Sequence, residues 1–175
     1  ELWCRDGVFE VLKCIDCELV FVNPCLNQKG LDIVYQGHHK KRFADKDEWK
    51  KRSSMYEIDR DFLLEVIDGG RILDVGCGGG KLVQQLHDRF RSDGGNIVPL
   101  GIEISNHLSE VAGEVLRSLG GDIIHASAIN GASQCSASSF DVIVMRSFLE
   151  HERRPLELLR EHRNLLRLRG AIIIK

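Results

Sequence analysis

The sequence has almost no net charge and no long apolar run. Its 24 Lys and Arg residues nearly balance its 26 Asp and Glu residues, which leaves a net charge of −2. Such a balance gives no electrostatic reason to bind nucleic acid or an anionic membrane surface. No stretch approaches the ~20 apolar residues that a membrane-spanning helix needs, and no secretory signal segment is present. We therefore expect no nucleic acid and no membrane among its partners; nothing in the sequence indicates an oligomeric state.

A disulfide framework is missing as well. The six cysteines stand at positions 4, 14, 17, 25, 77 and 135, so four of them fall within the first 25 residues. Small secreted domains spread their cysteines through the chain and pair them. The uneven spacing instead predicts reduced thiols and a cytoplasmic protein. The chain opens on Glu1 and stops at Lys175 directly after an apolar run, so we expect both ends to be cut.

What the sequence does contain predicts three segments. Residues 1–36 hold two strands, 8–13 and 19–22, joined by the knuckle Cys14-Ile-Asp-Cys17. Residues 37–68 are predicted to be a helical connector. The polar helical pattern itself covers residues 26–67. Its basic runs at 40–42 and 50–52 are interpreted as solvated helix faces, and His38-His39 as a surface turn. Residues 69–175 form the main domain.

In that domain, strand and helix patterns alternate. Strands are predicted at 71–75, 97–102, 123–125, 140–145 and 171–174, and helices at 81–90, 105–120 and 155–170. Ser105 is a plausible N-cap, and Pro155 and Gly170 are expected to bound the last helix. This alternation indicates an α/β fold with a doubly wound, mostly parallel, Rossmann-like sheet and a small N-terminal β-knuckle appendage.

The strongest motif is Ile72-Leu-Asp-Val-Gly-Cys-Gly-Gly-Gly80, in which a strand runs through Gly76, Gly78 and Gly80 into a helix. Glycines let the backbone turn sharply and approach a ligand closely. The helix N-terminus behind them offers free N–H groups to an anionic group, either a pyrophosphate or a carboxylate. A bare tight turn would give the same pattern.

Two carboxylates strengthen the prediction of a binding site. Asp74 ends the first strand and Glu103 ends the second. An acid at the second position can accept hydrogen bonds from both hydroxyls of a ribose at the switch point of the sheet. The alternatives are that Asp74 only holds the loop amides and that Glu103 is a solvated loop residue.

At these residues the chain resembles the class I S-adenosylmethionine-dependent methyltransferases. Leu73-Asp-Val-Gly-Cys-Gly-Gly-Gly80 is similar to their first motif, and Phe140-Asp-Val-Ile-Val-Met-Arg-Ser-Phe-Leu-Glu-His151 to the fourth-strand region of ubiquinone-biosynthesis-type members. The resemblance covers about residues 70–175. It implies that the glycines and Asp74 line the methionine part of the cofactor and that Glu103 holds its ribose. The same match adds these cofactor contacts: Cys77, Ile104, Ser127, Ala128 and Arg146.

Two departures from the family pattern matter. Where the family often has an acid facing the adenine amino group, this sequence has Ala126-Ser-Ala128. Ser127 is then the residue expected to hydrogen-bond the adenine. The family also adds two strands after the fifth, and we expect those strands to be missing here.

The resemblance implies methyl transfer to a small molecule, with O- or C-methylation of a sugar or other metabolite favoured. The sulfonium is an activated donor, so alignment of acceptor and methyl group is the main requirement. A hydroxyl acceptor also needs a base, for which His151 is the first candidate and Glu150 the second. Equally, both residues could cap the next helix and close the pocket.

Two rival functions stay open. One is an NAD-dependent oxidoreductase on a Rossmann fold, although such enzymes usually carry an aliphatic residue where Asp74 stands and place the third glycine one residue later. The other is a non-catalytic methyltransferase-like binding domain.

The segment Cys14-Ile-Asp-Cys-Glu-Leu-Val-Phe-Val-Asn-Pro24 resembles the second knuckle of a zinc-binding module that precedes some sugar and metabolite methyltransferases. The resemblance implies that Cys14 and Cys17 supply half of a zinc site in the full-length protein. Structural zinc takes four ligands, so the other pair would precede Glu1, with Cys4 and Cys25 as possible substitutes. Unmetallated thiols are the alternative.

Overall fold

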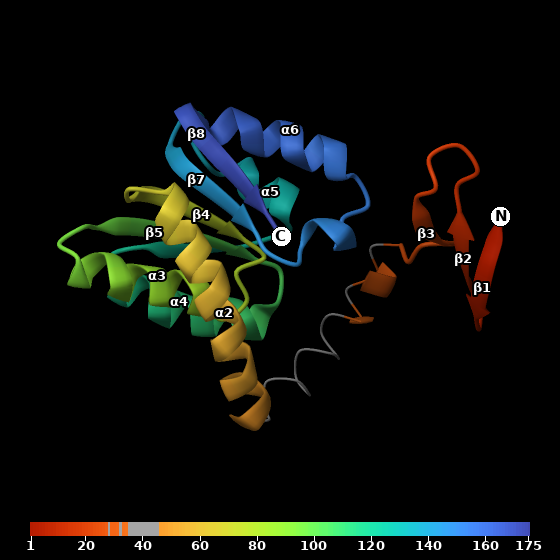
Figure 1. The fold of residues 1–175 in the computed structure, drawn as a ribbon, viewed down its shortest axis with the longest axis horizontal. Coiled ribbons are helices and arrows are strands. Elements are labelled where there is room, and N and C mark those ends of the chain that lie inside the picture. Colours follow the sequence, from red (N-terminus) through yellow and green to blue (C-terminus); the bar gives the residue numbers. More distant parts are fainter. Residues whose placement is uncertain (28, 32, 35–45) are drawn as a thin grey trace. The chain divides into compact units, whose positions relative to one another are not determined.

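The chain divides into two compact units, Glu1–His38 and His39–Lys175 (Figure 1). The computed structural model describes residues 1–27, 29–31, 33–34 and 46–175. The basic run at 40–42 and the pair His38-His39 lie outside the described residues. The division into segments 1–36, 37–68 and 69–175 stays a prediction.

The first unit contains a three-stranded antiparallel sheet in the order β1-β2-β3. Its strands are β1 (Leu2–Asp6), β2 (Phe9–Lys13) and β3 (Val20–Asn23), of which the first was not predicted. The turn that holds Cys14 and Cys17 joins β2 to β3, and the N–H of Cys14 donates to the carbonyl of Leu19 at 2.8 Å. All residues of β1 and β3 are exposed.

The second unit is built on a five-stranded parallel sheet in the order β6-β5-β4-β7-β8. Its strands are β4 (Gly70–Val75), β5 (Ile97–Glu103), β6 (Asp122–His125), β7 (Phe140–Met145) and β8 (Leu166–Ile174). Its helices are α2 (Lys46–Val66), α3 (Lys81–Ser92), α4 (Asn106–Ser118), α5 (Ala128–Ala132) and α6 (Pro155–Leu165). The predicted α/β class with a parallel sheet and an N-terminal β appendage is confirmed. Among the described helices, none has the length and apolar character to cross a membrane.

Helices cover both faces of this sheet, which explains why its strands are apolar on both sides. Ile72 and Val144 pack in one core with residues of α2, α3 and α4. Leu73 and Ile143, their neighbours in sequence, pack in a second core with residues of α5 and α6. Successive side chains of a strand point to opposite faces, so every strand residue can be assigned to one helical layer or the other.

The predicted cap and stripe of α4 are confirmed. The Ser105 hydroxyl accepts from the N–H of Leu108 at 3.5 Å. Behind it Leu108, Ala112 and Leu116 are buried at a spacing of four residues, which is one face of a helix.

The predicted helix over 155–170 is wrong at its C-terminal end. Helix α6 stops at Leu165, and β8 begins at Leu166. Leu166 pairs with Phe140, but Val142 pairs with Ala171, so the residues between form a bulge in which Arg169 has a φ of 68°. Arg167 in this bulge donates to both carboxylate oxygens of Asp141, at 3.0 and 2.8 Å. Tertiary pairing with β7 thus replaces the last helical turn.

Candidate cofactor-binding and active site

The carboxyl ends of the five parallel strands lie at one edge of the sheet, and β4 is where the strand order reverses. β4 pairs with β5 on one side and with β7 on the other. In open α/β sheets, ligands bind in the crevice outside the strand ends at this switch point. The glycine loop 76–80 follows β4 there and leads directly into α3, whose N-cap is Gly80.

The glycine loop is shaped by two of its glycines. Gly76 has a φ of 72°, and a Cβ at this position would overlap the ring of Phe148, which follows β7. Gly78 has a φ of 55°, and a Cβ there would meet nothing within 4 Å. The loop is therefore closed by an aromatic ring at Gly76 and open to an approaching ligand at Gly78.

Glu103 holds the open part of the loop. Its carboxylate is buried, with Oε2 accepting from the N–H of Gly78 at 2.9 Å and Oε1 from the N–H of Ser105 at 2.8 Å. Burial raises the pKa of Glu103, and these hydrogen bonds oppose the rise. A carboxylate has about four acceptor positions, so Glu103 can still receive a ligand hydroxyl. Glu103 is thus not a solvated loop residue.

Asp74 is buried beside Glu103, with 3% of its surface exposed. Burial and the charge of Glu103 raise the pKa of Asp74 to about 7, whereas the charge of Arg146 acts in the opposite direction. Two carboxylates on adjacent strand ends therefore share one water-poor site next to the glycine loop.

The other predicted cofactor contacts also follow the strand ends. Cys77 is buried in the loop, where burial raises the pKa of its thiol well above the usual value. The carbonyl of Ile104 accepts from Nε2 of His125 at 3.0 Å. Ser127 is the N-cap of α5, and its hydroxyl accepts from the N–H of Asn130 at 3.4 Å, while Ala128 begins that helix and is buried.

Glu150 and His151 lie in a short 3-10 helix, η1 (Leu149–His151), that follows β7. Each side chain is 55% exposed, and His151 Nε2 lies 3.9 Å from Glu150 Oε1. Neither residue caps the next helix, because the N-cap of α6 is Arg154 and has no side-chain hydrogen bond. The two side chains therefore stand at the same edge of the sheet as the glycine loop and are reachable from solvent.

Two charged residues near this edge, Asp59 and Lys175, were not predicted from the sequence. Asp59 of α2 is buried and forms ion pairs with Arg146 and with Lys175, which follows β8. The guanidinium of Arg146 also lies over the ring of Tyr56, 4.5 Å from its centroid. No local sequence signal marks Asp59, because it is one of several acids in a polar helix.

The two thiols Cys14 and Cys17 come together in the knuckle of the first unit. Hydrogen bonds from the backbone amides of Cys17 and Asp16 lower the pKa of the Cys14 thiol. Within the described residues, no group of three or more His, Cys, Asp or Glu side chains could hold a metal ion.

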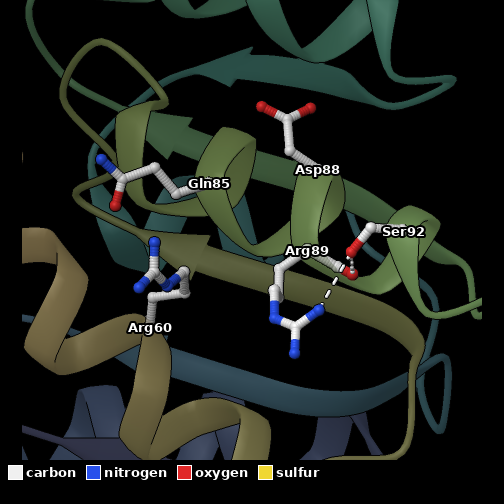
Figure 2. Close-up of a pocket in the computed structure, with 5 residues that line it drawn as sticks. All are labelled: Arg60, Gln85, Asp88, Arg89 and Ser92. Carbon is white, nitrogen blue, oxygen red and sulfur yellow. Dashed lines mark hydrogen bonds between the residues drawn. The ribbon is translucent and has the colours of Figure 1, made fainter.

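A separate hollow of about 290 Å³ lies between α2 and α3 (Figure 2). Figure 2 shows Arg60 reaching toward α3 from the neighbouring helix. Arg60 pairs with Asp61, and Arg89 pairs with Asp93, so both arginines are engaged by their own neighbours. The hollow is lined from the middle and C-terminal turns of α3, away from the glycine loop, and is not part of the site.

A family model described as a methyltransferase domain matches residues 67–175, and the chain belongs to this family. It is 29% identical over 109 residues to the ubiquinone biosynthesis O-methyltransferase of Actinobacillus pleuropneumoniae, covering 59% of this chain and 44% of that protein. The [4+2]-cyclase SpnF has a similar solved structure, with a TM-score of 0.55, 26% identity and coverage of 66% of this chain and 42% of that chain. The plantazolicin methyltransferase BamL, solved with S-adenosylhomocysteine, shares the fold at a TM-score of 0.55 and 21% identity over 77% of this chain and 53% of that chain.

These matches confirm the class I S-adenosylmethionine-dependent methyltransferase resemblance and its Rossmann-like fold. The chain spans less than half the length of the curated relatives it matches.

Proposed function

We propose that the protein transfers a methyl group from S-adenosylmethionine to a small molecule, by O- or C-methylation of a sugar or other metabolite. The observation that carries the proposal is the pair of buried carboxylates, Asp74 and Glu103, beside an open glycine loop at the switch point of the sheet. The name of the ubiquinone O-methyltransferase relative supports methylation of oxygen.

The residues present fit S-adenosylmethionine. Gly78 leaves room at the loop, and the carboxylate of Glu103 would accept from the ribose. Asp74 provides negative charge for the cationic methionine end. Ile104, Ser127 and Ala128 follow the next strand ends and would contact the adenine, with Ser127 in place of the family's acid.

When bound, S-adenosylmethionine supplies the methyl group on a sulfonium, which is an activated donor. The protein then has to hold the acceptor in line with that group. His151, exposed at the mouth of the site, would take the proton from a hydroxyl acceptor, and Glu150 beside it is the second candidate for this role.

Calorimetric titration with S-adenosylmethionine, S-adenosylhomocysteine and NAD tests the proposal. We expect the two adenosyl ligands to bind and NAD not to bind. Binding of NAD would favour the oxidoreductase, and binding of none of the three would favour a methyltransferase-like domain that acts by interaction. Transfer of labelled methyl to a panel of hydroxylated metabolites then identifies the acceptor.

Glu103→Ala provides the sharpest test of the ribose contact. We expect S-adenosylhomocysteine to bind more weakly by about 1.5–3 kcal/mol, the range for hydrogen bonds to a charged group. Because Glu103 also holds the amides of Gly78 and Ser105, the variant is compared with an analogue that lacks both ribose hydroxyls. The wild type should discriminate between the two ligands and Glu103→Ala should not; equal discrimination by both proteins would rule out the contact.

We also propose that Cys14 and Cys17 contribute two ligands to a structural zinc ion in the full-length protein. Their knuckle fits this role, because backbone amides stabilise the thiolate of Cys14, the form that binds metal. The remaining ligands of a four-coordinate site would come from outside the described residues. A reduced, cytoplasmic setting stays part of the proposal, since all six cysteines are free thiols.

A further inference from the structure

Four charged residues lie at or directly beyond the carboxyl ends of four neighbouring strands, toward one face of the sheet. In the strand order β5-β4-β7-β8 they are Glu103, Asp74, Arg146 and Lys175, so two acids lie beside two bases. Side chains alternate along a strand, and each of these residues is an even number of positions beyond a residue that packs toward α2, α3 and α4. Those apolar residues are Ile97, Ile72, Val144 and Ile173.

Arg146 and Lys175 both contact a single acid, Asp59, on α2. Asp59 of α2 accepts from Arg146 Nε through one carboxylate oxygen and from Lys175 Nζ through the other. Burial alone would raise the pKa of Asp59, but the two bases hold this pKa below its usual value. Asp59 is 8% exposed, which makes the contact a buried bridge between α2 and the ends of β7 and β8.

Arg146 is therefore fixed in place by two contacts and by burial. Its guanidinium is paired with Asp59, lies over the ring of Tyr56, and has only 16% of its side chain exposed. An arginine held this way has lost most of its rotamer freedom, so its charge stays at one place next to the site.

We propose that Asp59 is a positioning residue of the cofactor site, which holds Arg146 against Tyr56 so that a fixed positive charge acts on the buried carboxylate of Asp74. The proposal rests on the proposed function for the identity of the ligand. Asp59 itself touches neither the glycine loop nor the reacting groups; it acts through Arg146.

The charges around Asp74 show why a fixed base is needed. Asp74 is faced by Glu103 from β5, by the thiol of Cys77 from the loop and by Arg146 beyond β7. His125 lies close enough to Glu103 for its charge to act on that carboxylate. In the described part of the chain, Arg146 is the group whose positive charge lowers the pKa of Asp74. Without it, Asp74 would bind a proton where the cationic end of the cofactor needs a carboxylate.

The test is the pH dependence of S-adenosylhomocysteine affinity, measured by calorimetry between pH 6 and pH 9. Loss of a neighbouring opposite charge raises a carboxyl pKa by about one unit or more. Arg146→Gln should therefore bind about five-fold more weakly at pH 7 and nearly normally at pH 9. Asp59→Asn should shift the profile in the same direction, and the double variant should resemble Arg146→Gln.

Arg167→Gln and Asp141→Asn are matched controls, because this Arg–Asp pair joins the same two strands at their other end. They should leave the pH profile unchanged. Equal weakening at every pH, or additive effects of Asp59→Asn and Arg146→Gln, would indicate a merely structural contact and overturn the proposal.

A ligand-free measurement separates this inference from the proposed function. The carboxyl carbon of Asp74 is followed by NMR through a pH titration of the wild type and of Arg146→Gln. A higher midpoint in the variant supports the inference even if no adenosyl ligand binds, and an unchanged midpoint overturns it even if one does.

Discussion

At the scale of single residues, burial of the Asp74 and Glu103 carboxyl groups costs the folded state free energy. Each is buried, and burial raises the pKa of both carboxyl groups. The charge of Glu103 raises the pKa of Asp74 further. An apolar or amide residue would pack at the end of β4 with less cost. Retaining two carboxylates there is expected where a ligand, rather than the fold, requires them.

Asp74→Asn should therefore stabilise the ligand-free protein near pH 8. The pKa of Asp74 is raised to about 7 in the folded protein, so between its unfolded pKa and pH 7 the native state binds more protons than the unfolded state. The contribution of Asp74 to the free energy of unfolding is therefore highest at low pH and falls as the pH rises through this window. We expect a gain of roughly 2–4 kcal/mol at pH 8 and little gain at pH 4, measured by urea unfolding.

Asp141→Asn is the control for this effect, because its carboxyl pKa is lowered by a hydrogen bond from the Arg71 amide and by Arg167, despite some burial. Its substitution should destabilise the protein above the unfolded pKa and not below it. If the stability gain of Asp74→Asn were no larger at pH 8 than at pH 4, the pKa of Asp74 would not be raised by its burial.

His151→Ala should lower turnover by roughly 10²–10⁴ while leaving the affinity for S-adenosylhomocysteine nearly unaltered, because a general base acts on the acceptor and not on the cofactor. The measurement is single-turnover methyl transfer to the identified acceptor, alongside calorimetry. His107→Ala, an exposed position on α4, is the control. Parallel loss of turnover and cofactor affinity would instead assign His151 to closing the pocket.

The sequence predicted the parts of the site that are local. Asp74 and Glu103 could be proposed because each stands near the end of an apolar strand, and the glycine loop because its spacing is continuous in the chain. Asp59 was missed because its partners, Arg146 and Lys175, are 87 and 116 residues away. Which acid of a polar helix faces a strand end depends on packing, not on local pattern.

At the scale of elements, strand and helix existence was predictable and some boundaries were not. The apolar periods placed β4, β5, β7 and α4 within one or two residues of their observed bounds. The end of α6 was misplaced because Leu165, Leu166 and Leu168 continue the apolar pattern of a helix. The hydrogen bonds between β8 and β7 outweigh that local helix preference. Gly170 therefore lies in the bulge and not at a helix cap.

The bulge in β8 makes a prediction of its own. Arg169 has a φ of 68°, and its side chain is exposed. A left-handed conformation costs a residue with a Cβ about 1–2 kcal/mol, part of which is offset by the greater entropy that glycine loses on folding. Arg169→Gly should therefore raise stability by about 0.5–1 kcal/mol in urea unfolding. Arg169→Val, which is β-branched, should lower it; the reverse order would show that the bulge is not held in this conformation.

At the scale of the whole molecule, the two units differ in how they are stabilised. The second has a buried core on each face of its sheet. In the first, taken by itself, none of the described residues is buried. A unit of fewer than ~40 residues usually needs a disulfide, a metal or an association to stay folded. Its cysteines are free thiols, and within the described residues no group of three or more ligands could hold a metal, so a metal here needs ligands in addition to Cys14 and Cys17.

The last prediction follows from that difference. The full-length protein, purified without chelators, should hold one zinc per chain by elemental analysis, and its β1–β3 amides should be protected from hydrogen exchange. Cys14→Ser should remove the zinc and that protection together, because metal binding supplies the folding free energy of such a unit. Cys135→Ser, in the second unit, should change neither. Absence of metal in the full-length protein would end the zinc proposal, and protection that survives Cys14→Ser would mean that packing and not metal holds the small sheet.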